Sequence, residues 1–121
     1  MAAPIILVIL RLLQGLALGG GCEFVMHSPR AVVALESYIG LVEAGVGLIP
    51  AGGGCKEFAV RAADWAAQSA TPGEVFNFLQ PVFSTIAMAK VSNSAVNAQE
   101  LGLLRPTDKV VFNAYESLYI A

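Results

Sequence analysis

Two glutamates, Glu23 and Glu43, are the side chains of this sequence best suited to proton transfer. Both stand in apolar surroundings, and Glu43 follows Glu23 by twenty residues. A glycine cluster, Gly19 to Gly21, precedes the first glutamate, and a second cluster, Gly52 to Gly54, follows the other. Ordinary cores rarely need buried carboxylates beside glycine runs. The pattern therefore indicates a site where backbone N–H groups face an oxyanion while two carboxylates handle protons.

The first glycine cluster leads into a predicted short helix from Gly21 or Cys22 to about His27. A helix N-terminus offers unpaired N–H groups and partial positive charge, and glycine lets a ligand approach them closely. Glu23 lies in the first turn, beside that position. The alternative is that the glycines only permit close strand–helix packing and that Glu23 caps the helix. The spacing matches neither a dinucleotide-binding fingerprint nor a phosphate-binding P-loop.

Glu43 follows an apolar strand and precedes a glycine-containing loop, a position from which a carboxylate often reaches a cleft. An exposed loop acid is the equal alternative. We interpret His27 as a structural histidine at a helix end. Cys22 is more typical of a small buried residue than of a nucleophile, because no basic partner is placed to activate it.

Composition bounds the kind of protein. The 121 residues suit a single domain over 1–121. Of these residues, 56% are hydrophobic and 13% are charged, whereas about 25% are charged in typical soluble domains. The mean hydropathy of +0.68 predicts a buried oligomer interface or a missing neighbouring segment. A net charge of −2 gives no basic surface for nucleic acid. Two cysteines without a pairing motif favour a reduced, cytoplasmic setting, and we expect no metal and no cofactor.

An α/β order of elements follows from the hydrophobic pattern. Residues 5–10 predict a buried strand, since Arg11 makes the apolar run too short for a membrane span. Gly15 to Leu18 is expected to lead into the first glycine cluster. The remaining expected elements are strands over 31–35 and 38–42 separated by a turn at Glu36-Ser37, a loop over 44–47, helices over 55–68 and from Thr71-Pro72 past Ile86, a helix capped by Ser94 and ended by Gly102, a strand over 109–112 and a last helix from Asn113.

At the two glycine clusters and the two glutamates, the chain resembles the enoyl-CoA hydratase/isomerase (crotonase) family. The family has an A-L-G-G-G-C-E run and, twenty residues on, a second glutamate before G-x-G-x-I-P and more glycines. Here the first run is Ala17 to Glu23 and the second is Glu43 to Gly53. The residues in and around these two runs are most similar to the hydratase part of bacterial bifunctional 3-hydroxyacyl-CoA dehydrogenases. The resemblance extends from Gly15 to Phe112.

The resemblance implies a partial crotonase-like ββα spiral with C-terminal helices, acting on an acyl-CoA thioester. Gly20 would give one oxyanion-hole N–H, and Glu23 and Glu43 would hold and activate the water that adds at C3. A trimer-based homo-oligomer is the family precedent. Met1 to Leu13 do not match the family, whose longer N-terminal part supplies the second oxyanion N–H. The alternative is therefore a non-catalytic fragment retained for assembly or by descent, and without the dinucleotide fingerprint we expect no NAD binding.

Overall fold

The computed structural model describes residues 10–120. Its elements, in chain order, are β1 (Leu10–Leu18), α1 (Gly20–Met26), β2 (Arg30–Gly40), the 3₁₀ helix η2 (Glu43–Val46), α2 (Gly54–Ala67), α3 (Phe76–Ala87), α4 (Ala95–Glu100), β3 (Lys109–Val111), the 3₁₀ helix η3 (Ala114–Glu116) and α5 (Ser117–Ile120). Except for Leu10, the strand expected over residues 5–10 lies outside the described residues.

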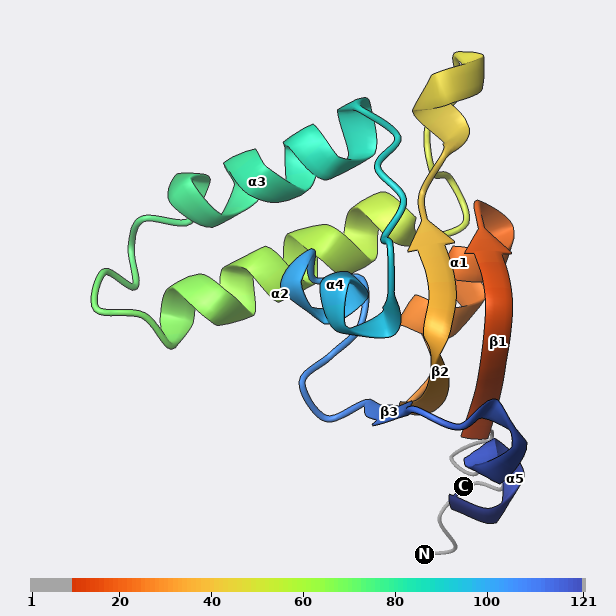
Figure 1. The fold of residues 1–121 in the computed structure, drawn as a ribbon. Helices are drawn as coiled ribbons and strands as arrows, with labels where there is room; N and C mark the ends of the chain where they lie inside the picture. Colours follow the sequence, from red (N-terminus) through yellow and green to blue (C-terminus); the bar gives the residue numbers. More distant parts are fainter. Residues whose placement is uncertain (1–9, 121) are drawn as a thin grey trace, which may run out of the picture.

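The expected α/β fold is confirmed. The described strands form a parallel sheet in the order β1-β2-β3, and α1 is the crossover that connects β1 to β2. Parallel strands need such crossovers, which bring their carboxyl ends to one edge. Figure 1 shows α2, α3 and α4 gathered on one side of the sheet, with α1 beside the strands. The end of β2, the start of α1 and the start of α2 therefore meet in one region.

The predicted turn at Glu36-Ser37 is wrong, because β2 runs unbroken from Arg30 to Gly40. The backbone irregularity lies instead in the pairing between β1 and β2, where the register shifts. Leu13 of β1 pairs with Val33 and Gly15 with Ser37, so three residues of β2 lie opposite one of β1. Gly15 takes a positive φ of 87° at this bulge, a conformation that glycine adopts without steric cost. β1 also continues through Leu18, where the sequence indicated only a connection.

The core lies between the sheet and the helices. Its largest fully buried side chains come from α1, the end of β2, α2 and the segment after α4: Met26, Ile39, Leu41, Phe58, Leu103 and Leu104. Trp65 of α2 packs against this core. The short α4 is positioned by the signals that its sequence predicted: Ser94 Oγ accepts the Asn97 N–H at 3.0 Å, and Gly102 takes a φ of 80° just past the end.

Helix α3 begins at Phe76, not at Pro72 as the sequence predicted. A helix starting here would need Thr71 and Glu74 to form a capping box, in which each side chain bonds the other residue's backbone N–H, but the Thr71 N–H and the Glu74 side chain have other partners. The Thr71 N–H donates to Ser69 Oγ, and the Glu74 carboxylate accepts from the Asn77 side chain. Residues 71–74 close a turn in which the Glu74 N–H donates to the Thr71 carbonyl. The start of α3 is therefore moved four residues along the chain.

Candidate active site

Glu23 projects from the first turn of α1 and is 7% exposed. Its Oε2 accepts the Gly54 N–H, the first of α2, at 2.8 Å. The same carboxylate lies close to the backbone of the second glycine cluster, since a Cβ added at Gly52 would fall 2.6 Å from Oε1. Glu23 therefore caps a helix, as the alternative interpretation allowed, but the helix is α2 and not its own. Glycine at position 52 leaves the room for this contact.

Glu43 begins η2, directly beyond the end of β2. The side chain is half-buried, and its Oε2 is a buried oxygen without a hydrogen-bond partner among the described residues. Its Oε1 faces the first glycine cluster, because a Cβ added at Gly19 would lie 3.3 Å from it. An exposed loop acid is thus excluded. An unsatisfied buried carboxylate oxygen is costly, so this oxygen of Glu43 needs an explanation.

The first glycine cluster is fixed against the end of β2. Gly19 takes a φ of 58° at the N-cap of α1, and its N–H donates to the Gly40 carbonyl at 2.9 Å. Gly20 is the first residue of α1, whose opening N–H groups have no partner within the helix. Nothing lies within 4 Å of the position that a Cβ on Gly20 would take, so the space beside it is open.

The charges of both glutamates affect the thiol pKa of both cysteines. Burial first, and then the negative charges of Glu43 and Glu23, raise the pKa of the Cys22 thiol to about 12. The same causes raise the pKa of Cys55, with Glu23 the larger of the two charges. Cys22 is fully buried, as expected, whereas Cys55 is partly exposed in the first turn of α2. Glu43 Oε1 faces Gly19, the N-cap of α1, and Glu23 lies in the first turn of the same helix, so both glutamates lie at the start of α1.

His27 is structural, as its position indicated. Its Nδ1 lies 2.7 Å from the Glu23 carbonyl and its Nε2 lies 3.0 Å from Lys56 Nζ. A carbonyl only accepts and an ammonium only donates, so the neutral tautomer protonated at Nδ1 fits both contacts. The ring packs on Gly53, where an added Cβ would lie 2.7 Å from it. His27 thus holds the end of α1 against the start of α2.

A buried ionic cluster beneath the glycine turns was missed by the sequence analysis. Glu57 Oε1 accepts from Arg61 Nε at 3.3 Å and from Arg105 at 3.2 Å. Arg61 is 6% exposed and also donates to the carbonyls of Met26 and Gly102. The cluster joins the end of α1, the first turns of α2 and the segment after α4. The i,i+4 spacing of Glu57 and Arg61 was the signal that could have revealed it.

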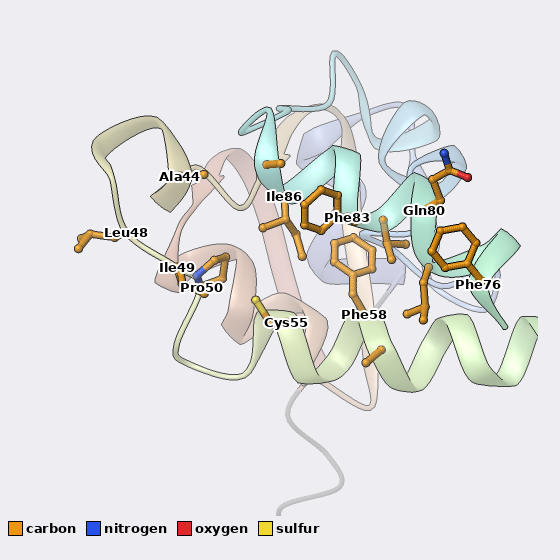
Figure 2. Close-up of a pocket in the computed structure, with 14 residues that line it drawn as sticks. Ala44, Leu48, Ile49, Pro50, Cys55, Phe58, Phe76, Gln80, Phe83 and Ile86 are labelled. Atoms are coloured by element: carbon orange, nitrogen blue, oxygen red, sulfur yellow. The ribbon is translucent and has the colours of Figure 1, made fainter.

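An apolar cavity of about 740 Å³ lies between the η2 loop, α2 and α3. Its walls come from the η2 loop, the first half of α2 and the length of α3, and Figure 2 shows their side chains. Ala44, which lines it, follows Glu43 directly, and Cys55 follows Gly54, whose N–H binds Glu23. Chain neighbours of Glu43 and of Gly54 thus line the cavity, although neither glutamate is among its lining residues. No pattern in the sequence predicted this cavity.

Residues 10–120 contain no group of three or more His, Cys, Asp or Glu side chains placed to hold a metal ion. Within the same range, no helix is both long enough and apolar enough to span a membrane.

Two relatives match this chain, one of them over most of its length. It is 43% identical over 107 residues to a Bacillus subtilis protein named "Probable 3-hydroxyacyl-CoA dehydrogenase", which covers 88% of this chain and 13% of the relative. It is 54% identical over 48 residues to the "Putative fatty acid oxidation complex trifunctional enzyme" of Rickettsia felis, covering 40% of this chain and 7% of that protein. The chain thus spans about an eighth of the length of the first relative. No protein-family model matches it.

Solved structures share the fold. The enoyl-CoA hydratase/isomerase of Cupriavidus metallidurans superposes with a TM-score of 0.65 at 17% identity, over 89% of this chain and 33% of that one. The enoyl-CoA hydratase of Mycobacterium tuberculosis gives a TM-score of 0.59 at 23% identity, over 89% and 35%. Fold, relatives and motifs agree with the resemblance found in the sequence. The chain has the fold of the enoyl-CoA hydratase/isomerase (crotonase) structures.

Proposed function

We propose that the chain carries an enoyl-CoA hydratase-type site of fatty-acid β-oxidation, which adds water across the C2=C3 bond of an enoyl-CoA thioester. The observation that carries this proposal is the state of Glu43. Its Oε2 is buried without a hydrogen-bond partner among the described residues, while Oε1 lies against Gly19 at the open start of α1. A substrate water bound there would satisfy the unpaired oxygen.

The two glutamates have different roles in this scheme. Glu43, with a free oxygen, holds and deprotonates the water, whose oxygen bonds to C3. Glu23, oriented by the Gly54 N–H at 2.8 Å, helps to position the water and to return a proton to C2. General acid–base groups of this kind contribute about 10² to 10⁴ in rate.

Gly20 supports the charge that develops on the thioester oxygen. Addition at C3 turns the thioester into an enolate, whose oxygen gains negative charge. The N–H of Gly20 stands at the first position of α1 beside open space. A donor held in place before the reaction stabilises that charge without reorganisation. We propose that the oxyanion-hole N–H comes from this residue.

A second candidate is a non-catalytic crotonase-fold segment that serves assembly. The observation in its favour is that Glu23 already has a structural task, since it caps α2 and fits against Gly52. A glutamate conserved in place only for that contact would give no hydration. The two free cysteines fit the cytoplasmic setting that we propose for either candidate.

Hydration of crotonyl-CoA by the purified chain, followed by loss of absorbance, distinguishes the two candidates. We expect Glu43→Gln to lower kcat by about 10² to 10⁴ and to leave acyl-CoA binding intact, because glutamine keeps the size but not the basicity. Glu36→Gln, an exposed acid in β2, is the matched control and should leave the rate unchanged. A folded wild-type chain without activity, or full activity in Glu43→Gln, would contradict the proposal.

A further inference from the structure

We propose that His27 is a positioning residue for the proposed hydration. Its imidazole holds the start of α2 at the distance from α1 at which the Gly54 N–H orients the Glu23 carboxylate. This task rests on the proposed function, in which Glu23 positions the attacking water and returns a proton to C2. The contacts that carry it involve no substrate, and they extend the structural role of His27 from the joint between two helices to the carboxylate itself.

The imidazole is anchored to the backbone of Glu23 itself. His27 Nδ1 lies 2.7 Å from the Glu23 carbonyl oxygen, and the His27 backbone N–H donates to the same oxygen at 3.1 Å. In the neutral tautomer that fits its contacts, Nδ1 is a donor, so this carbonyl accepts from both the ring and the backbone of one residue. These two bonds fix the ring relative to the residue from which the carboxylate projects.

The other edge of the imidazole lies against the glycine turn before α2. A Cβ added at Gly53 would fall 2.7 Å from both Cε1 and Nε2 of His27, closer than real side chains come. Gly53 takes a φ of 100° at the N-cap of α2, which glycine adopts without steric cost. Nε2 also accepts from Lys56 Nζ at 3.0 Å. The ring therefore contacts the start of α2 at a backbone position and at a side chain of the first turn.

Gly54, the residue after this contact, carries the N–H that orients the carboxylate. As the first residue of α2, Gly54 has no acceptor for its N–H within the helix, and Glu23 Oε2 accepts it at 2.8 Å. Glu23 is thus held at its carbonyl by His27 and at its carboxylate by Gly54. Because the ring lies between these two points, its width sets their spacing. Misplacement of a reacting group by about 1 Å can cost about 10²-fold in rate.

Positioning, rather than proton transfer, is the chemistry that these contacts allow. The ring meets the carbonyl of Glu23 and not its carboxylate. Its other nitrogen faces Lys56 Nζ at 3.0 Å and Glu57 Oε2 at 3.9 Å. General acid–base catalysis needs a group within hydrogen-bond reach of the proton that it moves. None of these contacts leads from the ring to the Glu23 carboxyl oxygens, so His27 acts on the site through the placement of Glu23 and Gly54.

Hydrogen exchange of the Gly54 N–H, followed by NMR on the full chain without substrate, tests the inference. Among the described residues this N–H has one acceptor, the Glu23 carboxylate, so its protection reports that bond. We expect His27→Ala to speed exchange at Gly54 by about tenfold or more, because the bond is weakened. The Glu57 N–H, which donates to the Gly53 carbonyl at 2.8 Å, should keep its protection. Unchanged protection of Gly54 overturns the inference.

Kinetics with crotonyl-CoA supply the second measurement. His27→Ala should lower kcat by about 10- to 100-fold, because the reacting group is displaced, and should change KM by less than about twofold. Ser28→Ala is the matched control. Ser28 Oγ donates to the Phe24 carbonyl at 2.8 Å, which is the same kind of bond one residue along, and this bond stays within the end of α1. Ser28→Ala should leave kcat and the exchange of Gly54 unchanged.

His27→Asn keeps the test valid even where His27→Ala fails to fold. The His27 side chain is 34% exposed, and asparagine suits the end of a helix. Asparagine retains an N–H near the Nδ1 position but lacks the ring that reaches Gly53, so both measurements should change as in His27→Ala. Wild-type protection of Gly54 in His27→Asn overturns the inference, as does fast exchange with a wild-type kcat.

The two measurements separate this inference from the proposed function. A wild-type chain that hydrates crotonyl-CoA, with Gly54 insensitive to both His27 variants, would defeat this inference alone. A wild-type chain without hydration, in which Gly54 exchange still responds to His27→Asn, would defeat the proposed function and leave the hold of His27 on the Glu23–Gly54 bond established.

Discussion

At the scale of single residues, the site depends on glycines, because a Cβ at their positions would collide with neighbouring side chains. The Glu23 carboxylate occupies the space in which Gly52 would carry a side chain, at 2.6 Å from its Cβ position. We expect Gly52→Ala to push this carboxylate away from the Gly54 N–H and to lower stability by about 1–3 kcal/mol, as overpacking does. The hydration rate should fall with it. Urea unfolding at constant m-value measures the stability change.

Gly73→Ala is the control for this substitution. Nothing lies within 4 Å of the Cβ position of Gly73, and the residue is exposed in the turn before α3. Where the backbone accepts alanine, such a change typically stabilises by about 0.4–1 kcal/mol through the unfolded state. If both substitutions had the same effect, the close approach of Glu23 to Gly52 would not matter for folding.

The sequence predicted which residues gather but not how each is satisfied. The glycine clusters and the spacing of Glu23 and Glu43 indicated two carboxylates beside a helix start, and the structure brings them to one region. The capping of α2 by Glu23 could not be predicted, because it joins residues 31 positions apart. The unpaired oxygen of Glu43 depends on all of its surroundings. Local patterns give residue types, whereas hydrogen bonding is a property of the folded neighbourhood.

At the scale of elements, local signals succeeded where they acted within one turn. Ser94 and Gly102 mark the start and the end of α4 as predicted, since each acts on backbone groups three or four residues away. The turn predicted at Glu36-Ser37 failed because the chain stays extended through the bulge, and Ser37 pairs with Gly15 of β1. Ser37 is fully buried, and its hydroxyl faces the Leu13 carbonyl at the bulge. Tertiary pairing overrode the local preference of two polar residues.

The joint between α1 and α2 predicts a pH dependence. Burial raises the pKa of Glu57, but the charge and hydrogen bond of Arg61, with Lys56 and Arg105, outweigh it and leave the pKa lowered from 4.5. A carboxyl whose pKa is lowered on folding stabilises the fold fully above its unfolded pKa, and this contribution is lost as the pH falls through the folded value. We therefore expect acid below pH 4.5 to destabilise the wild type more than Glu57→Gln.

The Glu57→Gln variant should begin from a lower stability at neutral pH. Arg61 is almost fully buried, and removal of its charged partner costs roughly 1–3 kcal/mol. Thermal or urea unfolding over a pH series measures both effects. Glu36→Gln, which changes an exposed acid outside the cluster, is the control and should follow the wild type. Parallel curves for wild type and Glu57→Gln at acid pH would show that the cluster does not titrate with folding.

At the scale of the whole molecule, one surface of the sheet is open and apolar. Near the carboxyl ends of the strands, Leu16 is 69% exposed, Leu18 37% and Tyr38 42%. These three side chains form what we call the sheet patch. In the described sheet, β1 is also an edge strand, whose outer backbone groups can pair with another chain. The prediction of self-association, drawn from the mean hydropathy of +0.68, thus gains a specific surface.

We expect Leu16→Lys to weaken self-association of the chain. A lysine in the sheet patch places a charge where an apolar contact would be desolvated, and a central interface residue commonly contributes more than about 1 kcal/mol. The dissociation constant, measured by light scattering over a concentration series, should rise about tenfold, which corresponds to about 1.4 kcal/mol. Val60→Lys, at an apolar position on α2, should leave the mass unchanged, as should Ala59→Trp in the apolar cavity between α2 and α3. A wild-type chain that stays monomeric at every concentration would contradict the prediction, and a loss of mass in Ala59→Trp alone would place the interface at α2 and α3.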